Sequence, residues 1–178
     1  MSRLNIVNPE TATGAAAELL DNVKAGMGAV PNITKVMANQ PAVLEMFLNI
    51  GGALSKGAFD AQTREAIALT VAGANKCDYC ASAHTAISQS LKVDQSEINQ
   101  NLQGKSSDPK LAALLTFSAA IVSKQGSVSD EDIAAVKSAG YDDAAIAEAT
   151  ANVSANIFTN YINHVAQTDI DFPEVKTS

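Results

Sequence analysis

Apolar residues recur three and four positions apart along most of the chain. That spacing places them on one face of an α-helix. Segments that alternate between apolar and polar residues, the pattern of a half-buried strand, are short and weak, as in RLNIVN near the start. Neither a glycine-rich phosphate loop nor a G-x-S-x-G motif is present. The pattern therefore predicts an all-α fold of about eight or nine helices.

Punctuating residues set the expected bounds of these helices, because proline favours a first helical position and glycine the position after the last. Asp60 is expected to cap one helix. The pairs Asp94 with Glu97 and Ser129 with Asp132 have the spacing of an N-cap and its capping-box partner. The expected helices follow Thr13 to about Gly26, then cover residues 31–40, 41–57, 61–74 and about 77–91, a short stretch after residue 94, and then residues 109–126, 130–140 and about 142–167.

The chain has 178 residues, a size that suits one domain, and no linker rich in proline, glycine or serine divides it. We expect a single domain over residues 1–178, with residues 1–10 as an N-terminal extension and residues 168–178 as a polar C-terminal tail. Apolar residues make up 47% of the chain and aromatic residues only 4%. Alanine is the most frequent apolar residue. Its small side chain and its high helix propensity favour helices that approach one another closely.

The charge balance argues against two classes of partner. The chain has 12 Lys and Arg against 19 Asp and Glu, a net charge of −7, with no basic run. Binding to nucleic-acid phosphates or to an anionic membrane surface needs such a basic surface. The sequence has no run of about 18 consecutive apolar residues, and its start, MSRLNIVNPETATG, does not read as a secretory signal. We expect a cytoplasmic protein that binds neither nucleic acid nor membrane.

The scarce reactive side chains are concentrated in one short segment. The chain has two cysteines and two histidines, and Cys77, Cys80 and His84 all lie in C-D-Y-C-A-S-A-H. On a helix that starts near Cys77, spacings of three and four put these side chains on one face, which continues through Ile87 and Leu91. We expect the apolar end of this face to be buried and the thiol end to lie at its margin.

This arrangement suits redox chemistry. The thiolate is the reactive form of cysteine, and a helix N-terminus stabilises negative charge. Two cysteines three residues apart can close a disulfide across one turn, so an attacking thiol has a resolving thiol within reach. Zinc binding is the alternative, because two thiolates and an imidazole supply three ligands. The sequence has no second cysteine pair for such a site, and we expect no metal.

Glu65 is the acidic residue that we expect to join this group. It lies on the apolar face of the predicted helix over residues 61–74. If the helices on either side of residues 73–76 form a hairpin, Glu65 approaches His84, and Glu, His and Cys form a proton relay. A buried salt bridge between subunits is the alternative role for this carboxylate.

Together, Glu65, Cys77, Cys80 and His84 give the pattern E-x11-C-x-x-C-x-x-x-H. This pattern resembles the alkylhydroperoxidase D-like, peroxidase-related branch of the carboxymuconolactone decarboxylase superfamily. The resemblance covers residues 19–173. It includes AVPNITKVMANQPAVLEMF before the motif and NYINHVAQTDIDFP near the end.

The resemblance implies an all-helical homo-oligomer, a trimer or hexamer, that reduces hydroperoxides without haem, flavin or metal. It implies that Cys80 attacks the peroxide and that Cys77 resolves the product. His84 would take the proton of Cys80, and Glu65 would pass it on. A dithiol donor of the lipoyl or thioredoxin type would reduce the disulfide. The decarboxylases of the superfamily lack the cysteine pair, so decarboxylation is not implied.

Tyr79 marks a departure from alkylhydroperoxidase D, which carries a histidine immediately before its second cysteine. We expect Tyr79 to be a packing or pocket-wall residue, and His164 to be a helix-end or pocket residue. Two other functions stay open at this point. One is a general thiol–disulfide oxidoreductase for which peroxide is incidental. The other is an oligomeric binding protein that uses the disulfide as a redox switch and has no turnover.

Overall fold

The computed structural model of the protein describes residues 2–177. Within these residues it has nine helices and no strand, so the predicted all-α class is confirmed. None of the described helices is both long and apolar enough to cross a bilayer. The helices are α1 (Gly14–Met27), α2 (Asn32–Met37), α3 (Pro41–Leu54), α4 (Ala61–Ala74), α5 (Asp78–Ser90), α6 (Gln95–Asn101), α7 (Pro109–Ser123), α8 (Asp130–Ser138) and α9 (Asp143–Ala166).

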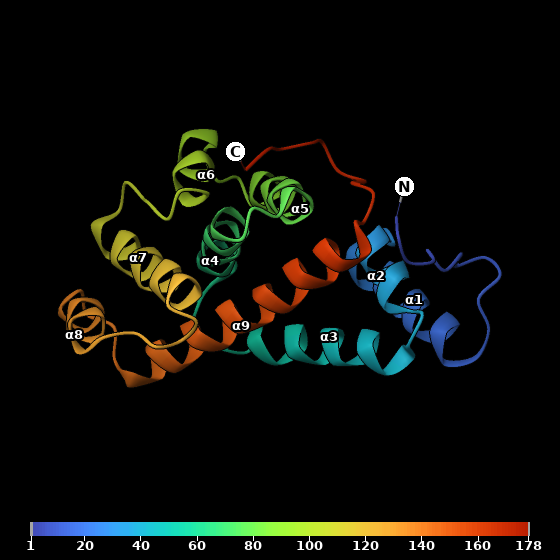
Figure 1. Ribbon diagram of the computed structural model, residues 1–178, viewed down its shortest axis with the longest axis horizontal. Coiled ribbons are helices and arrows are strands. Elements are labelled where there is room, and N and C mark those ends of the chain that lie inside the picture. Colours follow the sequence, from blue (N-terminus) through green and yellow to red (C-terminus); the bar gives the residue numbers. More distant parts are fainter. Residues whose placement is uncertain (1, 178) are drawn as a thin grey trace.

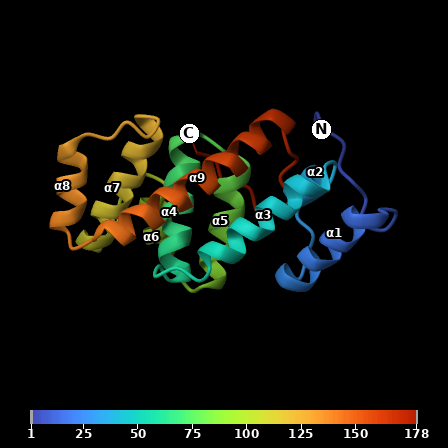
Figure 2. The same ribbon diagram turned by 90° about the horizontal axis from the view of Figure 1, so that it is seen from below.

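Helix α9, the longest, runs through the middle of the molecule (Figure 1). Helix α4 packs on α5, α7 and α9, while α1 and α2 lie at one end and α8 lies at the other (Figure 1). Helix α3 runs alongside α9, as the second view shows (Figure 2). After α9 the chain turns back across the molecule, which brings the C-terminal tail to the start of α5.

Two clusters of buried apolar side chains form the core. One lies around α4, α7 and α9 and includes Ile67 and Leu114. The other lies around α1, α2, α3 and α5, and the two cysteines belong to it together with Leu44. Burying one such aliphatic side chain stabilises the fold by roughly 1.5–3 kcal/mol. The thiols therefore sit inside packed structure, not on a mobile loop.

Two predicted helix starts are present as expected. The carboxylate of Asp60 accepts the N–H of Thr63 at 2.7 Å and caps α4. Ser129 and Asp132 form a complete capping box at α8. These bonds satisfy backbone donors that a helix N-terminus leaves unpaired.

The predicted capping box at α6 is wrong. Asp94 precedes α6 but makes no capping hydrogen bond with its side chain. The Glu97 carboxylate faces the loop after α6 instead, where it accepts the N–H and the hydroxyl of Ser107 at 3.1 and 2.7 Å. Glu97 therefore stabilises that loop rather than the helix start.

Gly73 is the glycine that lets α6 approach α4 closely. A Cβ atom at this position would lie 1.9 Å from the carbonyl oxygen of Leu102, a backbone atom. We expect Gly73→Ala to lower the free energy of unfolding by about 1–3 kcal/mol, because the backbones must move apart. Gly52→Ala is the matched control, since its Cβ meets nothing within 4 Å; it should be neutral or stabilising. Urea unfolding measures both, and a Gly73→Ala protein as stable as the parent would contradict this packing.

Candidate active site

The turn between α4 and α5 fixes the position of Cys77. Helix α4 ends in a Schellman motif, in which the N–H of Cys77 donates to the carbonyl of Ala72 at 2.9 Å and that of Lys76 donates to Gly73 at 3.2 Å. Lys76 has a φ of 55°, a conformation that usually favours glycine. Cys77 is thereby the N-cap of α5, and its Sγ accepts the N–H of Cys80 at 3.4 Å.

The two sulfur atoms lie side by side in the core. The Sγ atoms of Cys77 and Cys80 are 2.7 Å apart, and both thiols are free. A disulfide has an S–S distance of about 2.05 Å, so a small rotation of one side chain suffices to close it. The cysteines are only 1% and 3% exposed, whereas Ile87 is 40% exposed. The expected burial along this face is therefore wrong, because α9 and the C-terminal tail cover the thiol end.

A shared hydrogen bond sets the ionisation of the pair. It lowers the pKa of the Cys77 thiol, and the N–H of Cys80 lowers it further, against the opposing effect of burial. The same hydrogen bond raises the pKa of Cys80, and burial and the charge on Cys77 add to this. Groups this close titrate as a pair. The first proton lost leaves one negative charge, which rests mainly on Cys77.

The α4–α5 hairpin brings Glu65 and His84 together. The Nδ1 atom of His84 lies 2.7 Å from Oε2 of Glu65, and both side chains are largely buried. Burial by itself lowers the pKa of His84, but the charge of Glu65 and the hydrogen bond to it outweigh burial, so the pKa is raised. With Nδ1 held by Glu65, Nε2 is the ring atom that can exchange a proton with the cavity.

An apolar cavity of about 240 Å³ opens beside this pair, and Cys80, His84 and Glu65 all line it. Most of the remaining wall is aliphatic or aromatic. Such an enclosure with a few convergent polar groups is typical of a small-molecule site. The wall includes Phe47, Ile50, Leu54, Ala83, Phe158 and Phe172.

A second cavity, of about 420 Å³, lies on the other side of the pair and is lined by Cys77, His164 and Thr168. Tyr79 and Asn163 belong to the walls of both cavities. The two cysteines therefore line different cavities. Cys80 shares the apolar cavity with the Glu65–His84 pair, and Cys77 lines the second cavity.

His164 lies in the last turn of α9, whereas Cys77, Cys80 and His84 belong to α5 and its N-cap. It is exposed and reaches only the second cavity, while His84 is bound to Glu65. Within residues 2–177, no group of three or more His, Cys, Asp or Glu side chains is arranged to hold a metal ion.

Tyr79 joins the start of α5 to the C-terminal tail. Its hydroxyl donates to the carboxylate of Asp171 at 2.8 Å and accepts the N–H of Ile33 at 3.1 Å. Its ring packs edge-on against Phe172, with ring centroids 5.8 Å apart. Burial raises the pKa of Tyr79 well above its usual range, so it stays a neutral phenol. Since its proton is already donated to Asp171, Tyr79 is not free to donate a hydrogen bond to a substrate. It acts as a clasp that holds the C-terminal tail, and it lines the walls of both cavities.

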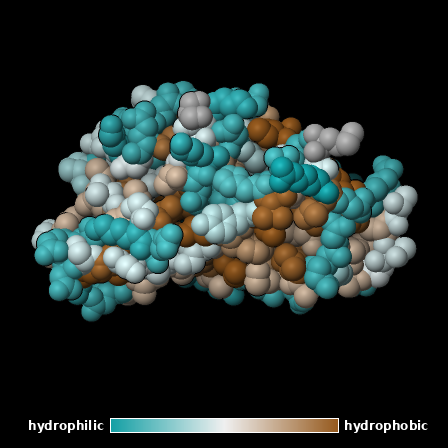
Figure 3. Space-filling model, in the orientation of Figure 1, coloured by the Kyte–Doolittle hydropathy of each residue, from teal (hydrophilic) through white to brown (hydrophobic). Residues whose placement is uncertain are grey.

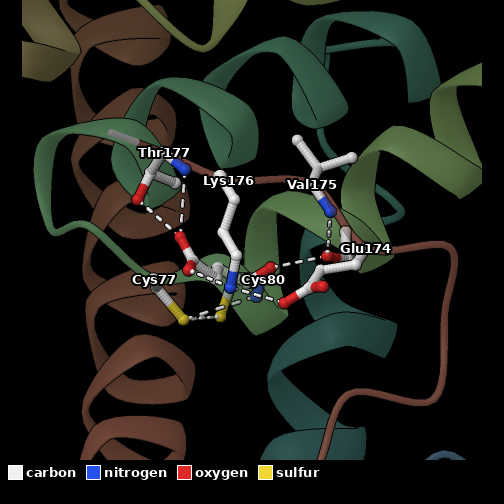
Figure 4. A network of polar contacts seen from close by, with 8 residues as sticks. Cys77, Cys80, Glu174, Val175, Lys176 and Thr177 are labelled. Carbon is white, nitrogen blue, oxygen red and sulfur yellow. Dashed lines mark hydrogen bonds and ion pairs between the residues drawn. The ribbon is translucent and has the colours of Figure 1, made fainter.

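The polar C-terminal tail is docked on α5, the helix that begins at the cysteine motif. Figure 4 shows Val175, Lys176 and Thr177 tied to the start of α5 by hydrogen bonds and an ion pair. The N–H of Val175 donates to the Ser82 hydroxyl at 2.9 Å. Thr177 donates its N–H and its hydroxyl to Asp78 at 3.0 and 2.7 Å, and Lys176 pairs with the same carboxylate at 3.2 Å. Asp78 and Ser82, two residues before and two residues after Cys80, therefore hold the tail against the start of α5.

We expect Tyr79→Phe to lower the free energy of unfolding by about 1–3 kcal/mol, because it leaves the buried N–H of Ile33 without its acceptor. The variant should also speed hydrogen exchange at the amides of Val175 and Thr177, which the clasp helps to hold. Tyr161→Phe is the control, since Tyr161 is 57% exposed. Unchanged exchange in the tail of Tyr79→Phe would show that the clasp does not hold it.

Sequence reasoning missed Asn163. Its Nδ2 atom donates to the Sγ of Cys80 at 3.2 Å. The sequence does contain a signal, because asparagine recurs at positions 152, 156, 160 and 163, the spacing of one helix face. Buried amides on one face of a helix need partners, and here one partner is the thiol.

Comparison with known proteins adds three findings. Residues 41–121 match the profile of the carboxymuconolactone decarboxylase family. No curated protein sequence matches the chain significantly. The fold is similar to that of a peroxidase-related protein from Ralstonia eutropha JMP134, an alkylhydroperoxidase AhpD core, with a TM-score of 0.85 and 22% identity over 96% of this chain and 92% of that one.

Two further solved structures share the fold. A peroxidase-related protein from Silicibacter sp. TM1040 has a TM-score of 0.81 and 21% identity, over 94% of this chain and 89% of that one. The debrominase Bmp8, as a cysteine-to-alanine variant in complex with 2,3,4-tribromopyrrole, has a TM-score of 0.79 and 18% identity, over 96% and 94% of the two chains. A shared fold at these identities leaves the activity to be argued from the site.

Proposed function

We propose that this chain, whose residues 41–121 match the carboxymuconolactone decarboxylase family profile, is a thiol-dependent peroxidase, an oxidoreductase that reduces hydroperoxides. One observation carries the proposal. Cys80 lines an apolar cavity together with His84 and Glu65, and the second thiol, Cys77, lies 2.7 Å away. This arrangement supports Cys80 as nucleophile, His84 as base, Glu65 as the orienting carboxylate and Cys77 as the resolving thiol.

The reaction that this geometry supports balances as follows. A hydroperoxide R–O–O–H enters the apolar cavity, and the Cys80 thiolate attacks its terminal oxygen. The S–O bond forms, the O–O bond breaks, and the alkoxide leaves with a proton from His84. Cys80 is then a sulfenic acid. Cys77 attacks that sulfur, the disulfide forms, and hydroxide leaves and becomes water. One dithiol and one hydroperoxide give one disulfide, one alcohol and one water.

The assignment of the attack to Cys80 rests on access. Negative charge is more stable on Cys77, but Cys77 does not line the apolar cavity. Moving one proton across the shared hydrogen bond places the charge on Cys80. Within residues 2–177, no hydrogen bond joins His84 directly to either sulfur, so a cavity water carries the proton between them.

The second cavity offers the reductant a separate approach. A dithiol donor, of the lipoyl or thioredoxin type, attacks the Cys77 sulfur of the disulfide and forms a mixed disulfide. The second thiol of the donor then displaces Cys77 and leaves the protein reduced. The 1% exposure of Cys77 favours a slender dithiol that can reach into this cavity.

The test compares oxidants. We expect cumene hydroperoxide to oxidise the reduced protein at least about ten times faster than hydroxyethyl disulfide does, because thiol exchange needs the buried sulfurs to reach a bulkier partner. Stopped-flow loss of free thiols measures both rates under the same conditions. A faster reaction with the small disulfide would favour a general thiol–disulfide oxidoreductase.

Reductive debromination is a second candidate. The fold is shared with a debrominase. The apolar cavity also has an aromatic wall that suits a flat ring, made of Phe47, Tyr79, Phe158 and Phe172. In that reaction a thiolate takes bromine from carbon, the ring gains a proton, and the second thiol displaces bromide to form the disulfide. Bromide release from 2,3,4-tribromopyrrole by the reduced protein distinguishes this candidate from the peroxidase.

We also propose a homo-oligomer, a trimer or hexamer. Apolar residues gather on the surface over α2, α3 and the C-terminal half of α9 (Figure 3). Met27, Met46 and Val165 are 52%, 42% and 65% exposed. Exposed apolar groupings of this kind often mark protein contacts. Light scattering should give a mass three or six times 18.4 kDa, and a monomer at micromolar concentration would contradict this.

A further inference from the structure

Four asparagines line one face of α9, and they fall into two pairs with different partners. Asn152 and Asn156 donate their Nδ2 groups to carbonyls of their own helix, those of residues 148 and 152, both at 2.9 Å. Such bonds are local and could form in any helix. Asn160 and Asn163 lie further along, where α9 passes the start of α5.

The second pair reaches across to the redox motif. The Oδ1 atom of Asn160 accepts a hydrogen bond from Asn75 at 3.0 Å, at the end of α4. The Nδ2 atom of Asn163 donates to the Sγ of Cys80 at 3.2 Å. These asparagines are 0% and 4% exposed. They therefore connect α9 to the turn before Cys77 and to the second thiol.

The carbonyl oxygen of the Asn163 side chain remains unused. Within residues 2–177, Oδ1 of Asn163 has no hydrogen-bond partner although the atom is buried. Buried polar atoms without partners are rare in folded proteins and often mark a functional site. Asn163 lines the apolar cavity beside Cys80, so a bound molecule is the available partner for its oxygen.

We propose that Asn163 is a further catalytic residue, whose N–H stabilises the Cys80 thiolate and whose carbonyl oxygen accepts the O–H of the bound hydroperoxide. This inference rests on the proposed peroxidase function. The donor side acts on sulfur, because a hydrogen bond to an ion is roughly twice as strong as one between neutral groups. The acceptor side acts on substrate, because the terminal oxygen that sulfur attacks is the one that carries the hydrogen. Asn163 gains and loses no proton and no electron in the reaction.

The effects on the pKa of Cys80 also support a donor role for Asn163. The hydrogen bond to Cys77 and burial raise the pKa of Cys80, whereas the amides of Asn163 and Asn160 lower it. Replacing Cys77 removes the largest opposing effect. Replacing Asn163 in that background then shows how much this one asparagine lowers the pKa of Cys80.

The experiment uses Cys77→Ser protein, which has one thiol, and measures its alkylation by iodoacetamide as a function of pH. We expect Asn163→Leu to raise the apparent pKa of Cys80 by about one unit and to slow alkylation at neutral pH about tenfold. Asn156→Leu, two turns earlier on the same face, should leave the midpoint in place. Asn163→Asp keeps the shape but puts a carboxylate beside the sulfur, and it should raise the midpoint at least as far.

The acceptor role has its own readout. Oxidation of the single thiol by cumene hydroperoxide should slow in Asn163→Leu by about tenfold more than alkylation does, because alkylation loses the donor and peroxide attack loses both contacts. Alkylation requires no peroxide, so it tests Asn163 even if hydroperoxides are not the substrate. The proposal is overturned if Asn163→Leu and Asn163→Asp, folded by circular dichroism, show the same midpoint as Asn156→Leu.

Discussion

Peroxide turnover is expected to fall by on the order of 10³-fold or more in Cys80→Ser, because the attacking sulfur is lost and the remaining groups act only through it. Serine is close in size and can still accept the hydrogen bond that Asn163 gives to Cys80. The fold should therefore persist, which a thermal melt checks. Coupled turnover with cumene hydroperoxide and dihydrolipoamide gives the rate.

Cys77→Ser is the matched control, since it removes the other thiol of the pair. We expect this variant to lose multiple turnovers but to react once with hydroperoxide, and the product is a sulfenic acid on Cys80 that dimedone traps. The lower pKa of Cys77 makes the opposite outcome a real alternative. A sulfenic acid formed on Cys77 in Cys80→Ser, at an undiminished rate, would reverse the two roles.

Glu65→Gln is expected to reduce the rate of thiol oxidation by about 10²-fold, the scale of a lost acid–base contribution. The exchange keeps the shape of the side chain and removes the charge that faces His84 at 2.7 Å. Without that charge, burial becomes the dominant effect on His84 and lowers the pKa of its ring. His84 is then less often protonated when the alkoxide leaves.

The same change alters how stability depends on pH. The pKa of His84 is raised in the folded protein above its ordinary value of about 6.5. Its pair with Glu65 therefore adds stability that is fully present below about pH 6.5 and is lost as the pH rises through the folded pKa. The stability advantage of the parent over Glu65→Gln should shrink across that window.

Proton NMR can follow the two imidazole rings separately, since the chain has only two histidines and His164→Gln assigns them. The midpoint of His84 should lie above about 6.5 in the parent and move down in Glu65→Gln. Equal midpoints in the two proteins would show that Glu65 does not control this ring.

Local chemistry made much of the fold and the motif predictable. The bounds of α4, the capping box at Ser129 and the helical class all follow from nearby residues. Residues 41–121 match the carboxymuconolactone decarboxylase family profile, in line with the resemblance seen in the motif, whose spacing is itself local. The contact of Glu65 with His84 followed from one further step, a hairpin between consecutive helices.

The remaining features depend on contacts between segments far apart in the sequence. Residues 168–177 appeared only as a polar tail, yet they dock on Asp78 and Ser82 and pack apolar side chains against the cluster that contains both cysteines. That docking is why the thiol end of α5, and not Ile87, is covered. Asn163 reaches Cys80 across a separation that no local pattern encodes. The Glu97 carboxylate accepts a hydrogen bond from Ser107 in the loop after α6, and it does not form the capping box with Asp94 that the spacing predicted.

A thiol count with intact mass shows directly whether Cys77 and Cys80 form one peroxide-reactive dithiol. Fully reduced protein is treated with a small excess of cumene hydroperoxide. We expect the loss of both thiols together with the mass of two hydrogens and no added oxygen, which means an intramolecular disulfide. Two thiols that stay free and unmodified would contradict it.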